Sequence, residues 1–212
     1  MIYEQATRAI QEATLYGILD TGYSNPEDWP DLARKLIRGG VGVLQVRAKD
    51  LEPTEILKWA QPVVPLAHEL GCPVIINDFP ELVQPLGAAG VHVGQDDLTV
   101  SEAKEQSDIS CVIGKSTHSL EQARQAQTDK ADYIGFGPIF TTPTKPGRPA
   151  IGPELITQMS HEISIPAFCI GGIKKENVSE LKARGAERVV IVSGLLQSSD
   201  PTTYAKEVIR SL

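Results

Sequence analysis

The 212-residue chain has only three cysteines, and their spacing excludes the usual sulfur-based sites. Cys72, Cys111 and Cys169 lie far apart, each at or within an apolar run, so they match neither the close pairs of metal fingers nor those of redox motifs. An odd number of cysteines also argues against a secreted disulfide scaffold. We therefore predict that all three are buried and behave as small hydrophobic side chains.

The sequence also lacks an apolar run long enough for a membrane span, which needs about 18 residues or more. Its N-terminal segment has neither a basic leader nor a small-residue cleavage site. These absences predict a cytoplasmic protein with no membrane partner.

Basic residues are outnumbered, with 20 Lys and Arg against 27 Asp and Glu and a formal charge of −7. A net negative charge repels nucleic acid and anionic lipid, so neither is expected as a partner. Any site for a small anionic substrate must therefore be a local cluster of cations. The composition is compatible with a homo-oligomer.

What the sequence does contain is a repeated alternation of short apolar runs and polar, helix-like spacers. The runs are almost continuous in Val, Ile and Leu, as in parallel strands that are covered on both faces. There are eight of them: ATLYGILD, VGVLQVRA, CPVIIND, GVHVG, SCVIGKST, YIGFGPIF, IPAFCIGG and RVVIVSG.

The spacers carry helix start signals, such as Thr99 with Glu102. The spacer ILKWAQPVVPLAHEL contains Pro62 and Pro65, which predict a bent or split helix. No linker or shift of composition divides the chain. Eight successive strand and helix units therefore predict one α/β domain over residues 1–212, a closed (β/α)8 TIM barrel with an added N-terminal helix over residues 2–12.

In such barrels the chemistry lies at the C-terminal ends of the strands. The second strand ends with Gln45, Arg47 and Lys49 in alternation, so all three point the same way while the strand stays extended. Two cations at one spot suit an anionic substrate. The alternative is a charged strand end that extends into solvent.

Acidic side chains follow the next two strands. Asn77 and Asp78 close the third strand, and Asp96 and Asp97 follow the fourth. Carboxylates from neighbouring loops suit Mg²⁺, which takes one or two protein carboxylates and fills its other positions with water and phosphate oxygens. The preference of Asn and Asp for turns is the alternative explanation.

The fifth strand ends with three polar side chains, Ser116, Thr117 and His118. His92 lies inside the fourth strand, and we predict that it is a hydrogen-bonded core histidine rather than a ligand. His118 is therefore the histidine that remains as a candidate for chemistry.

The loop after the sixth strand contains Thr142, Thr144 and Lys145, which offer two hydroxyls and an ammonium to oxyanions. Neighbouring prolines restrict this loop.

The seventh strand ends with Gly171 and Gly172 and the eighth with Ser193, the positions where barrels often bind phosphate through backbone N–H groups. Together with the cations of strand two, these residues predict two anion sites.

In this order, the motifs LQVRAKD, IINDF, GVHVGQDDL, IGKSTHS, DYIGFGPIFTTPTK, IPAFCIGGI and VVIVSG resemble the thiamine phosphate synthase family over nearly the whole chain. The resemblance implies a transferase that joins hydroxymethylpyrimidine diphosphate to hydroxyethylthiazole phosphate, or its carboxylated form, and releases pyrophosphate.

The resemblance also implies roles for individual residues. The implied contacts of the pyrimidine diphosphate are Gln45, Arg47, Lys49, Asn77, Ser116 and Lys145. The implied ligands of Mg²⁺, the expected cofactor, are Asp78 and Asp97. The implied contacts of the thiazole phosphate are Thr142, Thr144, Gly172, Val192 and Ser193. The implied catalytic residues are Arg47, Lys49, Lys145 and Ser116.

The family mechanism is dissociative, with departure of the diphosphate before capture of the pyrimidine-methyl cation by the thiazole nitrogen. Arg, Lys and Mg²⁺ that are already in position around the diphosphate stabilise the negative charge that it gains as it leaves. The absence of an acid and base pair among the motifs agrees with this chemistry.

Two other functions compete with this one. A thiazole tautomerase shares the fold and needs a histidine for proton transfer, and His118 occupies the comparable position. Such an enzyme has no use for a diphosphate site. A non-catalytic sensor of phosphate ligands is the other alternative, because fold alone does not fix function.

Overall fold

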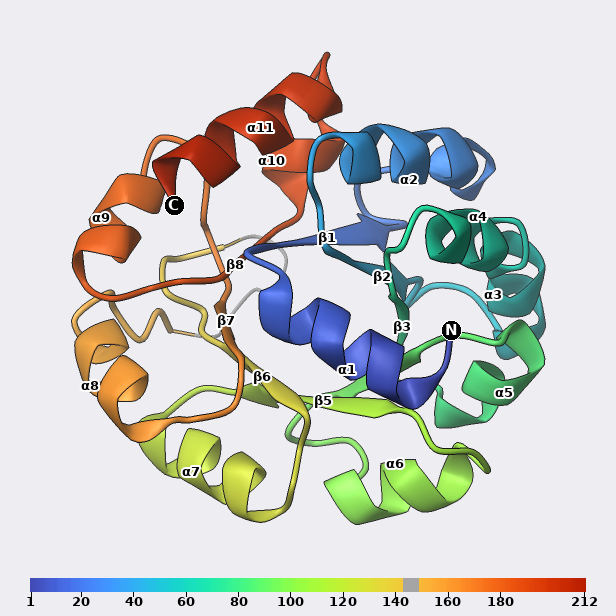
Figure 1. Cartoon of the computed structure of the whole chain (residues 1–212), viewed down its shortest axis with the longest axis horizontal. Helices are drawn as coiled ribbons and strands as arrows, with labels where there is room; N and C mark the ends of the chain where they lie inside the picture. Colours follow the sequence, from blue (N-terminus) through green and yellow to red (C-terminus); the bar gives the residue numbers. More distant parts are fainter. Residues whose placement is uncertain (143–148) are drawn as a thin grey trace.

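The computed structural model describes residues 1–142 and 149–212, and within them eight parallel strands close into a barrel in sequence order (Figure 1). The predicted TIM barrel is confirmed. Its strands are β1 (Leu15–Asp20), β2 (Val43–Arg47), β3 (Val74–Asn77), β4 (Gly90–Val93), β5 (Val112–Thr117), β6 (Tyr133–Phe136), β7 (Ala167–Cys169) and β8 (Val189–Ile191).

Helices surround the barrel and cover the outer face of its strands (Figure 1). The α-helices of the described residues are α1 (Tyr3–Glu12), α2 (Trp29–Arg38), α3 (Pro53–Ala60), α4 (Val63–Glu69), α5 (Val83–Leu86), α6 (Val100–Gln106), α7 (Leu120–Thr128), α8 (Leu155–Glu162), α9 (Val178–Ala183), α10 (Ser193–Leu196) and α11 (Pro201–Ser211). Short 3-10 turns, η1 (Pro26–Asp28) and η2 (Pro80–Leu82), precede α2 and α5. None of these helices has the length and apolar character that a bilayer crossing requires.

The local signals in the sequence explain where helices start. Thr99 and Glu102 form a capping box at the start of α6, as predicted. The proline-containing spacer forms two helices, so the predicted split is confirmed. Pro62 lies between α3 and α4, and Pro65 lies in the first turn of α4, where its missing N–H leaves no helical hydrogen bond unmade.

The predicted N-terminal helix is present as α1, and it lies across one end of the barrel (Figure 1). Its buried Ala6 and Ile10 belong to the same apolar cluster as the barrel-interior side chains of Val43, Ile75 and Val112. Burial of this face stabilises the helix, since a ten-residue segment is marginal by itself. The helix fills the N-terminal end of the barrel and leaves the C-terminal end for a cavity.

The main apolar core lies between the outer face of the barrel and the helices. Cys72, Cys111 and Cys169 are all buried and unpaired, as predicted. Burial raises the pKa of the Cys72 and Cys169 thiols to about 12, so both remain protonated at neutral pH. These two cysteines are packing residues with little nucleophilic character.

Candidate active site

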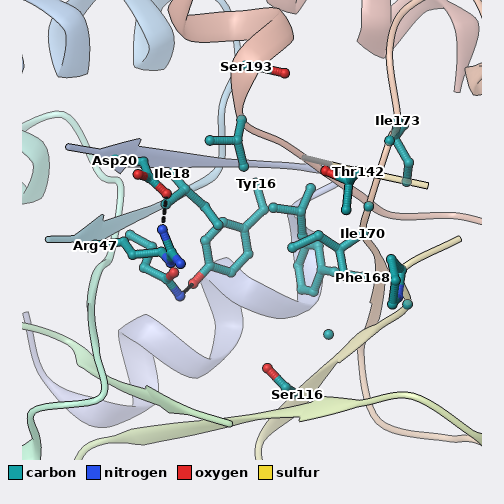
Figure 2. A pocket seen from close by; sticks show the side chains of 18 of the residues that line it. Tyr16, Ile18, Asp20, Arg47, Ser116, Thr142, Phe168, Ile170, Ile173 and Ser193 are labelled. Atoms are coloured by element: carbon teal, nitrogen blue, oxygen red, sulfur yellow. Dashed lines mark hydrogen bonds and ion pairs between the residues drawn. The ribbon is translucent and has the colours of Figure 1, made fainter. Parts of the chain in front are cut away.

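A cavity of about 730 Å³ lies at the C-terminal ends of the barrel strands. Strand ends and loops from around the barrel contribute to its wall, and Figure 2 shows and labels some of these side chains. Eight predicted site residues line it: Gln45, Arg47, Asn77, Ser116, Thr142, Gly172, Val192 and Ser193. The predictions for Thr144 and Lys145 fall outside the described residues.

Arg47 is held by an acidic partner that the sequence reasoning did not select. Asp20 and Arg47 are paired in register at the ends of β1 and β2, and Arg47 Nη1 lies 2.5 Å from Asp20 Oδ2 (Figure 2). The Asp20 side chain is only 2% exposed, and its other oxygen accepts a hydrogen bond from the Gly22 N–H at 2.8 Å. The signal was available, because Asp20 closes the first apolar run as Arg47 closes the second.

A chain of hydrogen bonds crosses the floor of the cavity. Gln45 Nε2 donates to the Tyr16 hydroxyl at 3.0 Å, and the hydroxyls of Tyr16 and Tyr133 are 3.0 Å apart. His92 continues the chain, with Nδ1 3.1 Å from the Tyr133 hydroxyl and Nε2 2.9 Å from Ser116 Oγ. Burial raises the pKa of both tyrosines, which keeps their hydroxyls protonated and available as donors.

His92 is therefore hydrogen-bonded through both ring nitrogens, as predicted, but its predicted place in the core is wrong. Its side chain is half-buried and lines the cavity. The reason is its register, because the barrel interior is apolar near α1 and becomes polar at the C-terminal ends of the strands. His92 pairs with Asn77 of β3 at that polar level.

Lys49 does not continue the line of Gln45 and Arg47. Strand β2 ends at Arg47, so the alternation stops before Lys49, which is exposed and is not part of the cavity wall. Its ammonium lies 3.6 Å from Asp78 Oδ2 at the rim. Lys49 thus lies beside Asp78, one of the two predicted metal ligands.

The two predicted metal ligands lie close enough to influence each other. Burial, and then the nearby Asp97 carboxylate, raise the pKa of Asp78. Asp78 also has a left-handed backbone with φ of +66°, which an aspartate tolerates better than most residues. Asp97 is exposed, and its Oδ2 accepts a hydrogen bond from the Gly94 N–H at 2.9 Å.

This pair of carboxylates fits a hard divalent cation. The described residues contain no cluster of three or more His, Cys, Asp or Glu side chains suited to a metal ion. The described residues therefore offer no metal site made entirely of protein ligands. Mg²⁺ does not need one, because it commonly binds through one or two carboxylates and completes its coordination with water and phosphate oxygens. The mutual repulsion of Asp78 and Asp97 would be relieved by such a cation.

The opposite wall of the cavity is formed by the loops after β6, β7 and β8. The Phe140 N–H donates to the Gly171 carbonyl at 3.0 Å, which joins the first two loops. Gly171 and Gly172 have φ of +98° and +64°, and an added Cβ would come within 2.4 Å of Pro138 and 2.7 Å of Phe140. Both positions therefore require glycine for their conformation and for close packing.

His118 also lines the cavity, so the structure retains it as a candidate. Its Nδ1 lies 2.5 Å from the Gly137 carbonyl, which places the proton of a neutral ring on Nδ1. Its backbone N–H donates to Gln122 Oε1 at 2.7 Å, beside the start of α7. These contacts fix the ring in the wall of the cavity.

Comparison with known proteins identifies the family. A family model described as thiamine monophosphate synthase matches residues 15–195. The chain belongs to this family. It is 40% identical to the thiamine-phosphate synthase of Thermus thermophilus over 83% of this chain and 85% of the relative. It is 36% identical to that of Syntrophomonas wolfei over 92% of this chain and 94% of the relative.

A solved structure agrees with this assignment. The thiamine phosphate pyrophosphorylase from Pyrococcus furiosus superimposes with a TM-score of 0.84 at 26% identity, and the match covers 98% of this chain and 96% of that chain. The resemblance drawn from the sequence motifs is confirmed, and so is the expected class of enzyme, a transferase that releases pyrophosphate.

Proposed function

We propose that this member of the thiamine monophosphate synthase family joins 4-amino-2-methyl-5-hydroxymethylpyrimidine diphosphate to hydroxyethylthiazole phosphate or its carboxylated form, giving thiamine phosphate and pyrophosphate. The observation that carries the proposal is that a single cavity of about 730 Å³ is lined by Arg47, Gln45 and Asn77 on one side and by Gly172 and Ser193 on the other. Such a volume is within the range of small-molecule sites. Two anionic substrates would meet in it.

The first side suits the pyrimidine diphosphate. Arg47 is held by Asp20 with its guanidinium at the cavity wall, and an arginine can contact phosphate oxygens through several N–H groups. Gln45, Asn77 and Ser116 add polar groups that can hydrogen-bond the pyrimidine. Lys49, at the rim, would contact the diphosphate, and the same role is proposed for Lys145.

The second side suits the thiazole phosphate. Ser193 and Thr142 both line the cavity, at separate places on its wall (Figure 2). Each supplies a hydroxyl that can donate a hydrogen bond to the phosphate. Gly171 and Gly172 let the loop after β7 pack closely against the loop after β6, and backbone N–H groups of this wall would bind the phosphate. Val192 would act mainly through its backbone, and Thr144 is proposed as a further hydroxyl donor.

We further propose that Asp78 and Asp97 hold Mg²⁺ beside the diphosphate. Their mutual influence and the chemistry of two carboxylates support this choice. When bound, the ion would neutralise negative charge on the diphosphate oxygens. Lys49, 3.6 Å from Asp78, adds a second positive charge at the same rim.

In the proposed reaction the bond between the pyrimidine methylene carbon and the diphosphate oxygen breaks, and its electron pair leaves with the diphosphate. The thiazole nitrogen donates its lone pair to the resulting cation, which forms the new C–N bond and the charged thiazolium ring. Arg47, Lys49 and Lys145 stabilise the departing charge, and one such contact contributes about 3 kcal/mol to catalysis. Ser116 orients the pyrimidine through its position beside His92.

A pyrophosphate-release assay tests the proposal. The protein is incubated with Mg²⁺ and the pyrimidine diphosphate, with and without the thiazole phosphate, and the product is identified by mass. Pyrophosphate release that depends on both substrates, together with thiamine phosphate, supports the synthase. Isomerisation of a thiazole tautomer without pyrophosphate would favour the tautomerase and His118, and binding without turnover would favour the sensor.

Separate variants test the two sides of the cavity. Ser193→Ala should raise the KM for the thiazole phosphate about tenfold and leave the KM for the pyrimidine diphosphate unchanged, because it removes one hydroxyl donor from the second side. Ser101→Ala, on the exposed surface of α6, is the matched control. An equal change in both KM values would contradict the division of the cavity.

A further inference from the structure

Lys115 occupies an unusual place in the barrel. Along β5, Val112 belongs to the interior cluster and Ser116 faces the cavity, whereas Ile113 belongs to the outer core. Alternation therefore directs Lys115 to the outer face, where β5 packs against α6 and α7. Apolar side chains are expected on this helix-covered face, so a half-buried lysine needs an explanation.

The ammonium of Lys115 holds both ends of one loop. Nζ donates to the Gly94 carbonyl at 2.6 Å and to the Leu98 carbonyl at 2.9 Å. These carbonyls lie at the start and near the end of the segment that links β4 to α6, and Asp97 lies between them. The ammonium therefore fixes the span of the loop that carries a proposed metal ligand.

Asp97 closes the same loop through its own side chain. Its Oδ2 accepts the Gly94 N–H at 2.9 Å, so Gly94 is bound on its N–H by Asp97 and on its carbonyl by Lys115. A Cβ added to Gly94 would lie only 2.4 Å from Asp97 Oδ2. The carboxylate position thus depends on the local conformation of Gly94, which Lys115 helps to determine.

Burying the charged ammonium of Lys115 costs free energy unless nearby carboxylates and hydrogen-bond acceptors compensate for the lost water. Burial lowers the pKa of Lys115, while the nearby carboxylates, with Asp97 first, then Asp129, Glu102 and Asp96, act in the opposite direction. The charge is compensated partly by these acids and partly by the two loop carbonyls. An apolar side chain would avoid the cost of burial but would leave both carbonyls without this donor.

We propose that Lys115 is a positioning residue that fixes the Gly94–Leu98 loop and thereby holds the Asp97 carboxylate beside Asp78 for a divalent cation. The inference rests on the proposed function, because it assumes that these two carboxylates bind the metal. Lys115 acts through the loop and touches neither substrate. It is absent from the cavity wall, so its effect is separable from that of Arg47.

The test compares Lys115→Met with the wild-type protein. Methionine keeps a long unbranched side chain but removes the donors. Binding of Mn²⁺, as a probe for Mg²⁺, is measured by electron paramagnetic resonance in the presence of inorganic pyrophosphate, and amide hydrogen exchange is followed over residues 94–98. We expect about a tenfold weaker affinity for Mn²⁺ and faster exchange, because loss of a group that orients a metal ligand typically costs tenfold or more.

The matched control is Lys104→Met. Lys104 lies on α6, and its ammonium also donates to a backbone carbonyl, that of Lys130 at 3.0 Å. The control removes a comparable contact outside the Gly94–Leu98 loop, so Mn²⁺ affinity should not change. Lys115→Arg, which keeps a charged donor, should recover part of the affinity. Should Lys115→Met fail to fold, Gly94→Ala tests the same loop, since it displaces Asp97 Oδ2 and should weaken Mn²⁺ binding similarly.

The outcomes separate this inference from the proposed function. If the wild-type protein makes thiamine phosphate and binds Mn²⁺ while Lys115→Met and Lys104→Met bind it equally well, Lys115 is a structural residue and the inference is wrong. If the wild-type protein neither binds Mn²⁺ nor releases pyrophosphate, the proposed function fails, and the inference fails with it. The inference about Lys115 would also be wrong if Lys115→Met raised the KM for the thiazole phosphate by as large a factor as it raised the dissociation constant for Mn²⁺.

Discussion

Asp20 and Arg47 form an ion pair across the adjacent ends of β1 and β2, with 2.5 Å between Oδ2 and Nη1. The side chains are 2% and 14% exposed, so the pair is largely shielded from water. A buried arginine needs such a partner, and the pairing also limits the orientations of its guanidinium. Asp20 therefore presents Arg47 to the cavity in one arrangement.

Asp20→Asn should lower kcat/KM for the pyrimidine diphosphate about tenfold, because a neutral amide orients Arg47 less well than a carboxylate does. The free energy of unfolding should fall by about 1–3 kcal/mol, as expected when a buried charged group loses part of its hydrogen bonding. Steady-state kinetics and urea denaturation measure the two effects.

Two controls sharpen this prediction. Asp31→Asn breaks an exposed pair with Lys35 on α2 and should leave the free energy of unfolding almost unchanged, because solvent screens such a pair. In an Arg47→Ala background, Asp20→Asn should have little further effect on kcat/KM. Full additivity of the two losses would mean that Asp20 does not act through Arg47.

Arg47→Ala and Lys145→Ala should each lower turnover about a hundredfold while the fold survives, because each removes a cation that stabilises the departing diphosphate. Turnover at saturating substrates and circular dichroism of the same samples provide the measurement. Near-normal rates in both variants would reject the assignment of these residues to the diphosphate.

Asp78→Ala should raise the Mg²⁺ concentration needed for half-maximal activity, because it removes one of the two carboxylates proposed to hold the ion. The measurement is a Mg²⁺ titration of the initial rate at fixed substrate concentrations. Asp96→Ala is the matched control, since Asp96 adjoins Asp97 in the sequence but is not assigned as a ligand. A larger shift from Asp96→Ala than from Asp78→Ala would reassign the ligand.

His68 should make folding stability sensitive to acid. Burial, and then the positive charge of the N-terminal ammonium, lower the pKa of His68 to about 4, from an ordinary value of 6.5. Between these two pH values the unfolded chain binds more protons than the folded one, so stability falls as the pH drops from about 6.5 to 4. The N-terminal ammonium lies 3.3 Å from His68 Nδ1, and its positive charge favours the neutral form of the ring.

Urea midpoints at pH 7.5 and 5 measure this effect. His68→Gln should reduce the loss of stability between the two pH values, because glutamine does not titrate in this range. His161→Gln, at an exposed position on α8, is the matched control and should leave the loss unchanged. The same pH dependence in wild-type and His68→Gln proteins would show that other groups are responsible.

The sequence by itself determined the architecture of this protein. Eight nearly continuous apolar runs require cover on both faces, and the polar spacers between them can provide it only as helices, which leads to a closed parallel barrel. It also determined which of several polar residues line the cavity, since residues that close parallel strands must meet at one end of the barrel. Arg47 and Ser193 could be selected for that reason although they lie far apart in the chain.

Only the tertiary structure decided which partner each polar side chain meets. The pairing of Asp20 with Arg47 depends on strand register, the place of His92 depends on its height within the barrel, and the end of β2 at Arg47 separates Lys49 from the cavity. The contacts of Lys115 with Gly94 and Leu98 depend on a loop conformation that no local pattern encodes. The physical reason is that periodicity fixes which face a residue occupies, whereas its partners are set by distances between segments remote in the sequence.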